Sequence, residues 1–232
     1  MAVQLPALCP LSCPGCRTIE FNRKGDIPGE LDLIKSYLDL LESGDSLFIT
    51  STGEPGLTEG YKELVTDIVN RGVEVAVCCA NKISLIPGMV RAEISRSQEQ
   101  DKTSLFAIAE ARKQGIPYVA TVVNFGQYDH VSFEDLAEQL DNPDAIIIRK
   151  AQPEGAAKSL LAHDKQKHDR TRIWKKEGVY LGKIFPMACF HEFEDYRNGI
   201  PITCIDHMGQ AVRWLGGEII GEAPQKVITL VR

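Results

Sequence analysis

The sequence predicts an α/β protein: a partial (β/α)6 TIM-type barrel followed by a mostly β C-terminal appendage. In residues 1–152, short apolar runs rich in β-forming residues alternate with amphipathic helical patterns. This alternation is typical of right-handed βαβ units with a parallel sheet. A closed eight-unit barrel takes about 250 residues, and six strands are used by residue 148. We therefore expect six units in residues 1–152 and a separate appendage in residues 153–232.

The predicted strands of the barrel are short runs enriched in β-branched and aromatic residues. In chain order they are Val3–Leu8, Ser46–Thr50, Val73–Cys78, Val90–Ser95, Tyr118–Val123 and Ala145–Ile148. Four segments between them carry apolar residues at spacings of three and four, which is typical of helices. These segments are Glu30–Glu42, Thr58–Asn70, Glu99–Gln114 and Ser132–Leu140. Ser132 and Asp135 have capping-box spacing, and the connection after Cys79 has room for a single helical turn.

The last 80 residues change character. Gly155–Glu177 is helical in pattern. The stretch from Lys158 to Lys176 contains seven Lys or Arg residues but only two Asp residues, so it is basic. We interpret this basic stretch as a solvated helix face; contact with an anionic substrate or a protein partner is the alternative. Four strands are predicted after it: Val179–Phe185, Ile202–Asp206, Gln210–Leu215 and Val227–Val231. The segment Asp206–Gly209 is predicted to be a hairpin connection.

Composition excludes several classes of protein. The 232 residues contain no run of about 18 apolar residues, as a membrane-spanning helix would need. The first residues lack the basic and apolar regions of a secretory signal. The formal net charge of −6 argues against bulk nucleic-acid binding, which requires an excess of Lys and Arg. Seven cysteines, an odd and clustered set, favour a reducing compartment. We expect a cytoplasmic protein that does not bind membranes.

Three cysteines, Cys9, Cys13 and Cys16, lie within eight residues directly after the first predicted strand. Two prolines and a glycine among them prevent a regular helix, so the segment is a loop that can fold its thiolates around one centre. A [4Fe–4S] cluster is held by Cys thiolates, and three ligands leave one iron open. The alternatives are a structural zinc with a distant fourth ligand, or three unrelated cysteines. A zinc ribbon usually has two CxxC pairs, and this chain has no second pair.

The CxxxCxxC spacing after a first strand resembles the signature of radical S-adenosylmethionine (radical SAM) enzymes. The resemblance implies that the open iron of a [4Fe–4S] cluster binds the amino and carboxylate groups of S-adenosylmethionine. It also implies reductive cleavage to a 5′-deoxyadenosyl radical that abstracts hydrogen from a substrate, with an electron donor such as flavodoxin or ferredoxin. The residue before the third cysteine is usually aromatic in that family and packs by the adenine; this chain has Gly15 there.

A second motif follows the second predicted strand. Thr52-Gly53-Glu54-Pro55 is similar to the GGEP motif that binds the amino group of S-adenosylmethionine in radical SAM enzymes, with Thr52 in place of the first glycine. A glycine permits close approach of the backbone, and a carboxylate suits an ammonium group. The alternative is an ordinary loop.

Polar residues also end three later strands. Ser95 and Asn124 are candidates for the ribose hydroxyls of the cofactor, and Arg149 for a carboxylate. The alternative is that polar residues mark where strands enter solvent. Cys78 and Cys79 end the third strand and point to opposite faces, so one of them is a weaker candidate for the active-site mouth.

The appendage contains two Cys/His pairs, Cys189 with His191 and Cys204 with His207. Together they have the composition of a tetrahedral zinc site or an auxiliary cluster, although incidental residues are the favoured interpretation. For function, the sequence favours a radical SAM enzyme acting on a small metabolite or nucleoside. An activase that makes a glycyl radical on a protein partner is one alternative. A non-catalytic iron–sulfur or zinc protein is the other.

Overall fold

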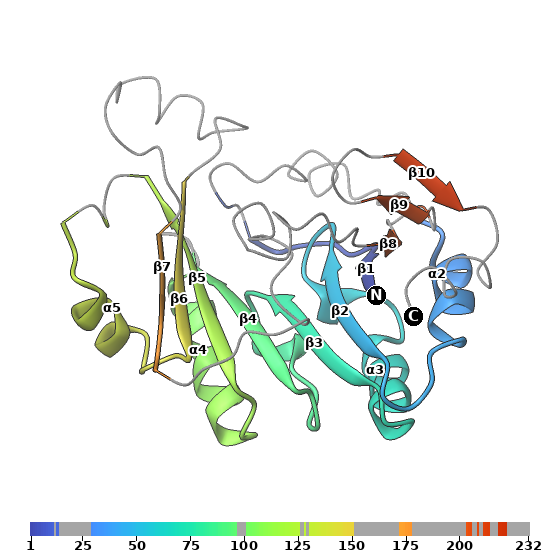
Figure 1. The fold of residues 1–232 in the computed structure, drawn as a ribbon, viewed down its shortest axis with the longest axis horizontal. Coiled ribbons are helices and arrows are strands. Elements are labelled where there is room, and N and C mark those ends of the chain that lie inside the picture. Colours follow the sequence, from blue (N-terminus) through green and yellow to red (C-terminus); the bar gives the residue numbers. More distant parts are fainter. Residues whose placement is uncertain are drawn as a thin grey trace.

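The computed structural model describes residues 1–11, 13, 29–96, 101–125, 128, 130–150, 172–177, 203–205, 208, 211–213 and 218–221. Its described strands form one mixed sheet in the order β10-β9-β8-β1-β2-β3-β4-β5-β6-β7 (Figure 1). The first six strands are β1 (Ala2–Leu5), β2 (Ser46–Ser51), β3 (Glu74–Cys79), β4 (Arg91–Arg96), β5 (Tyr118–Asn124) and β6 (Ala145–Lys150). The last four are β7 (Arg172–Lys175), β8 (Thr203–Ile205), β9 (Ala211–Arg213) and β10 (Glu218–Gly221).

The described helices lie in the connections between β1 and β6. They are α2 (Leu31–Leu38), α3 (Tyr61–Asn70), α4 (Asp101–Lys113) and α5 (Phe133–Gln139), with 3-10 turns η1 (Pro55–Leu57) and η2 (Lys82–Ser84). Ser132 caps α5 as its spacing predicts, because its side chain accepts a hydrogen bond from the Asp135 amide at 3.0 Å. The single turn expected after Cys79 is η2. No helix in the described part of the chain is long and apolar enough to cross a membrane.

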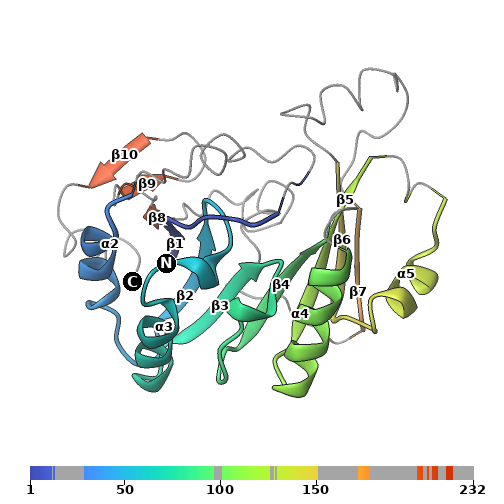
Figure 2. The same ribbon diagram turned by 180° about the vertical axis from the view of Figure 1, so that it is seen from behind.

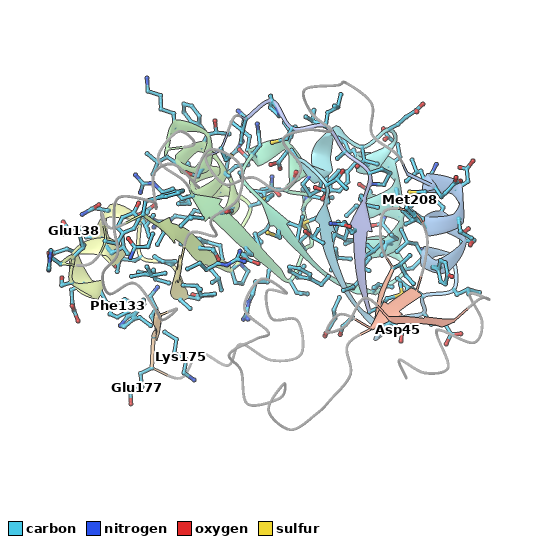
Figure 3. All side chains as sticks on the ribbon, turned by 90° about the horizontal axis from the view of Figure 1, so that it is seen from above. Asp45, Phe133, Glu138, Lys175, Glu177 and Met208 are labelled. Carbon is cyan, nitrogen blue, oxygen red and sulfur yellow. The ribbon has the colours of Figure 1, made fainter. Side chains whose placement is uncertain are left out.

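Strands β1 to β6 are neighbours in chain order and all parallel. Right-handed crossovers between such strands place the connecting helices on one face of the sheet. Figures 2 and 3 show α3 and α4 together on one side of it, with α5 beyond the edge formed by β6 and β7. The predicted α/β class with a mostly parallel sheet is confirmed, whereas curvature into a partial barrel stays a prediction.

The main hydrophobic core lies between the sheet and these helices. Alternate residues of the strands contribute to it, such as Val75, Val77 and Cys79 of β3 and Ile146 and Ile148 of β6. Because successive strand side chains point to opposite faces, the residues between them lie on the other face of the sheet.

The predicted helix Gly155–Glu177 is wrong where the structure describes it. Arg172–Lys175 is strand β7, antiparallel to β6, with Trp174 opposite Ile146. The physical reason is local: Ile173 and Trp174 favour a strand, and the flanking Arg172 and Lys175 suit a sheet edge. Residues 155–171 lie outside the described part of the chain. Lys175 is at the same end of the sheet as Phe133 of α5 (Figure 3).

The rest of the appendage extends the opposite edge of the sheet. Strand β8 pairs parallel with β1, and β8 and β9 pair antiparallel, as the predicted hairpin requires. Strand β10 was not predicted, because its apolar content is the single pair Ile219–Ile220 after two glycines. The predicted strands Val179–Phe185 and Val227–Val231 lie outside the described residues, and the boundary at residue 152 stays a prediction.

Candidate functional site

The segment that leads to the predicted cluster leaves the middle of the sheet. Strand β1 lies between β2 and β8 and ends at Leu5. Cys9 and Cys13 follow it; both are half-buried and neither forms a disulfide. Cys16 and Gly15 lie outside the described residues. Among the residues that are described, no three His, Cys, Asp or Glu side chains are grouped as a metal site, which leaves the three-cysteine prediction open.

Thr52 joins the end of β2 to this segment. Its hydroxyl is buried, accepts a hydrogen bond from the Ala7 amide and donates one to the Ala7 carbonyl, both at 3.0 Å. The Thr52 amide donates to the Leu5 carbonyl at 2.9 Å. Thr58 adds a further bond, from its hydroxyl to the Pro6 carbonyl at 3.1 Å. The loop after β2 therefore continues the pairing with β1 beyond the end of the regular ladder.

The backbone of Gly53 packs directly against the backbone of the segment after β1. A Cβ at Gly53 would overlap the carbonyl oxygens of Ala7 and Leu8. The Gly53 carbonyl accepts a hydrogen bond from the Ser51 hydroxyl at 2.6 Å, and the Glu54 amide donates to the Leu8 carbonyl at 2.9 Å. Close approach of the Ala7–Leu8 backbone thus requires glycine at position 53.

The Glu54 carboxylate is buried, and both of its oxygens are hydrogen-bonded to other residues of the protein. It is 2% exposed; its Oε1 accepts a hydrogen bond from the Ser84 hydroxyl, and its Oε2 accepts one from the Ala80 amide at 3.0 Å. Ser84 in turn accepts from the Gly56 amide at 2.8 Å. Its carbonyl accepts from the Tyr61 hydroxyl at 2.7 Å. The described partners of Glu54 therefore belong to the β3–β4 connection.

Burial sets the proton affinity of this carboxylate. Burial raises the pKa of Glu54 to about 7, against the opposing effect of the hydrogen bonds from Ser84 and from the Ala80 and Asn81 amides. The same burial raises the pKa of the Tyr61 hydroxyl, with Cys79 and Glu54 adding to the effect. Glu54 can thus change its protonation state near neutral pH while it holds the β3–β4 connection to the loop after β2.

On the face of the sheet away from α3 and α4, polar side chains gather in the carboxyl half of the strands. The strand register places these side chains on one face, which we call the polar inner face: Gln4, Thr50, Cys78, Glu93, Ser95, Thr121 and Arg149. Two predicted site residues, Ser95 and Arg149, belong to it. Asn124 does not: it lies on the helix side of β5, is buried, and accepts a hydrogen bond from the Tyr128 amide at 3.2 Å.

Glu93 and Thr121 are buried polar residues of the polar inner face that the sequence analysis did not single out. The signal was present, because Arg91-Ala92-Glu93-Ile94-Ser95 alternates polar and apolar residues in a strand expected to be buried on both faces. In the structure Glu93 is 2% exposed and Thr121 is fully buried. The Thr121 hydroxyl donates to Glu93 Oε1 at 2.6 Å.

Of the two Cys/His pairs in the appendage, three residues lie outside the described part of the chain. Cys204 is in β8, opposite Ala2 of β1 and Val212 of β9. Of the two adjacent cysteines, Cys79 is buried in the core on the helix side, and Cys78 is half-buried on the polar inner face. Burial raises the pKa of both thiols well above the usual range.

Comparison with known proteins gives distant likenesses among solved structures. No protein-family model matches the chain, and no curated protein matches it. A solved structure of TYW1 with a lysine–pyruvate adduct bound is similar at a TM-score of 0.39 and 16% sequence identity. The similarity covers 58% of this chain and 58% of that chain, so the chain matches less than two thirds of that protein.

Proposed function

We propose that this chain is a radical SAM enzyme whose six parallel strands form a partial barrel. Cys9, Cys13 and Cys16 would hold a [4Fe–4S] cluster, for which three thiolates on one loop are a fitting set of ligands. When bound, the reduced cluster supplies the electron that cleaves S-adenosylmethionine into methionine and a 5′-deoxyadenosyl radical, which takes a hydrogen atom from the substrate.

One observation carries this proposal: the loop Thr52–Glu54 is hydrogen-bonded to, and packed against, the backbone that leads directly to Cys9. Hydrogen bonds from Thr52 and Glu54 and the close approach of Gly53 bind the two motifs to each other. A cysteine loop and a cofactor loop that act on one molecule must keep a fixed separation, and these contacts supply it. An ordinary surface loop has no need for a buried reciprocal hydrogen-bond pair.

Within the proposal, the residues of the second motif have different roles. Glu54 is a positioning residue, because both of its oxygens are bound by the β3–β4 connection. The ammonium group of S-adenosylmethionine would bind backbone carbonyls of the loop, such as that of Gly53, which has a second lone pair beside the bond from Ser51. Pro55 is buried at the start of η1 and fixes the direction of the chain after the loop.

The polar inner face supplies the remaining contacts of the proposal. Ser95 and Arg149 share this face, so a cofactor ribose and carboxylate can reach both of them. Asn124 is assigned no contact, since its amide oxygen is bonded to Tyr128 on the helix side. A small metabolite or a nucleoside remains the favoured substrate, with flavodoxin or ferredoxin as the class of electron donor.

Anaerobic reconstitution tests the proposal. The wild-type chain should bind about four irons and, when reduced with S-adenosylmethionine, form 5′-deoxyadenosine. Cys13→Ala should lose most of the iron because the loop has no spare thiolate. Cys78→Ala is the matched control, since it removes a half-buried thiol from elsewhere on the sheet and should keep the iron. A full complement of iron in Cys13→Ala, or no 5′-deoxyadenosine from the iron-loaded wild type, would contradict the assignment.

A further inference from the structure

The described residues contain two fully buried carboxylates, and they differ in how their oxygens are used. Both oxygens of Glu54 accept hydrogen bonds from the chain. Glu93 uses only Oε1, which accepts from the Thr121 hydroxyl; its Oε2 is buried and accepts no hydrogen bond from the described residues. A buried acceptor without a donor costs free energy, and native proteins rarely keep one without a use for it.

The surroundings of Glu93 are those of a binding surface. Glu93 lies on the polar inner face, next to Cys78 on β3 and two residues deeper in the sheet than Ser95. At a rise of about 3.3 Å per residue, that places Glu93 about 7 Å below Ser95 along the strand. A group that binds Glu93 therefore lies deeper on this face than one that binds Ser95 at the strand end.

The charges around Glu93 limit what it can bind. Burial raises the pKa of Glu93, while the Arg149 guanidinium, the Thr121 hydroxyl and the Cys78 thiol favour the ionised form. In the ionised form the free oxygen is an acceptor, so its complement is a hydrogen-bond donor. A second carboxylate or a phosphate would meet the ionised Glu93 as a like charge, which disfavours it as the complement. Arg149, half-buried on the same face, is the residue that we assign to the carboxylate of the cofactor, so it is not counted among the substrate contacts.

We propose that Glu93 is a substrate-binding residue whose free Oε2 accepts a hydrogen bond from an N–H group of the substrate. Two classes of molecule carry this chemistry: amines, and nucleobases with an amino or ring N–H group. The inference deepens the proposed function, because it assigns the recognition chemistry of the substrate on the same face of the sheet. It differs from the cofactor contacts, which we assign to the strand ends and the Thr52–Pro55 loop.

A stability comparison tests this without knowledge of the substrate. The double variant Glu93→Met, Thr121→Val removes both oxygens of the carboxylate together with the Thr121 hydroxyl that binds Oε1, leaving an apolar pair of similar shape. Removal of an uncompensated polar group from a binding site should raise Tm by about 2–4 °C for a chain of this size. The matched control is Glu54→Met, Ser84→Ala, which removes the same types of group from a fully bonded carboxylate. It leaves the Ala80 and Gly56 amides without acceptors and should lower Tm by more than about 4 °C.

The outcome of that comparison is decisive in either direction. A Tm for the Glu93 double variant at or above wild type, with a clear loss in the control, supports a ligand-binding role for Glu93. Equal losses in the two double variants would overturn the proposal, because Glu93 would then be a structural residue like Glu54. This result does not depend on cluster chemistry: if the iron-loaded wild type forms no 5′-deoxyadenosine, the proposed function fails while the contrast in Tm still stands.

A binding experiment identifies the class of donor. The reconstituted full chain, saturated with S-adenosylmethionine, is titrated with putrescine and lysine as amine probes and with cytidine and guanosine as nucleobase probes. We expect one class to raise the wild-type Tm and the shift to vanish in Glu93→Gln, which keeps an oxygen for Thr121 and replaces the free acceptor by a donor. The affinity for S-adenosylmethionine should change less than about twofold. A shift that persists in Glu93→Gln, no shift with any probe, or a tenfold loss of S-adenosylmethionine affinity would overturn the proposal.

Discussion

Replacement of Glu54 by glutamine tests whether this buried carboxylate titrates as its surroundings require. Glutamine has the shape of the protonated acid and keeps an oxygen for the Ala80 amide, but it cannot ionise. Burial raises the pKa of Glu54 from its ordinary value of 4.5 to about 7 in the folded chain. The variant therefore removes one proton-linked contribution to stability and leaves the packing almost unchanged.

The sign and size of the effect follow from proton linkage. Below pH 4.5 both the folded and the unfolded chain carry the proton on Glu54. Between pH 4.5 and 7 only the folded chain keeps it, so unfolding releases a proton and the free energy of unfolding falls as pH rises. A pKa difference of about 2.5 corresponds to about 3 kcal/mol, at about 1.36 kcal/mol for each tenfold change. Above pH 7 the loss is complete.

Urea denaturation at pH 4.5, 5.5, 6.5 and 7.5 measures this loss. The free energy of unfolding of the wild type minus that of Glu54→Gln should fall by about 3 kcal/mol across the series. Glu93 titrates in both proteins and cancels in the difference. Glu63→Gln, on the exposed side of α3, is the matched control and should follow the wild type. A difference that stays constant within about 0.5 kcal/mol would refute the reasoning from burial.

Substitutions at Gly53, Thr52 and Tyr61, with two control variants, test the contacts around the second motif. Gly53→Ala should lower the free energy of unfolding and the iron content together, because its Cβ overlaps backbone that leads to Cys9. Gly44→Ala is the control: Gly44 has a positive φ, which Gly53 does not, but a Cβ there meets open space, so urea denaturation should show a loss of only about 1 kcal/mol and iron analysis no change. Thr52→Val should lower the free energy of unfolding by about 1–3 kcal/mol in the same assay, since it leaves the buried Ala7 amide without its acceptor. Thr52→Ser, which keeps the hydroxyl, should retain most of the wild-type stability. Tyr61→Phe should cost about 1 kcal/mol through loss of the bond to the Ser84 carbonyl, and an unchanged midpoint would contradict that contact.

The predictable part of this fold is the part with a local signal. Six strands and four helices of residues 1–152 could be placed from apolar periodicity, and Tyr118–Val123 differs from β5 by one residue. The first strand was predicted to run to Leu8 but ends at Leu5, because the chain beyond Pro6 pairs with the loop after β2 instead of with the strand itself. The error in Gly155–Glu177 has a different cause, since the local strand preference of Ile173 and Trp174, which pair with β6, was outweighed by the helical pattern of the longer segment.

The candidate site was predictable only where a motif marks it. The glycine of the second motif was predicted to permit close approach of the backbone to a ligand, which stays a prediction; the structure adds a reason of its own, the close approach of Ala7 and Leu8. The partner of Glu54 was not predictable, since Ser84 is thirty residues away on another connection and no local pattern links them. Glu93 was not predicted because it lies within β4, two residues before the polar strand end at Ser95 from which the candidate residues were chosen.

The position of β1 in the sheet has a consequence for synthesis of the chain. One edge of β1 pairs with β2 within the first 51 residues, but the other edge pairs with β8, which is made about 200 residues later. Until then the strand that leads to the cysteine loop presents open amide and carbonyl groups, a template for another chain. A chain truncated after residue 150 keeps that edge open permanently. It should self-associate where the full chain stays monodisperse, and size-exclusion chromatography of the two would show the difference.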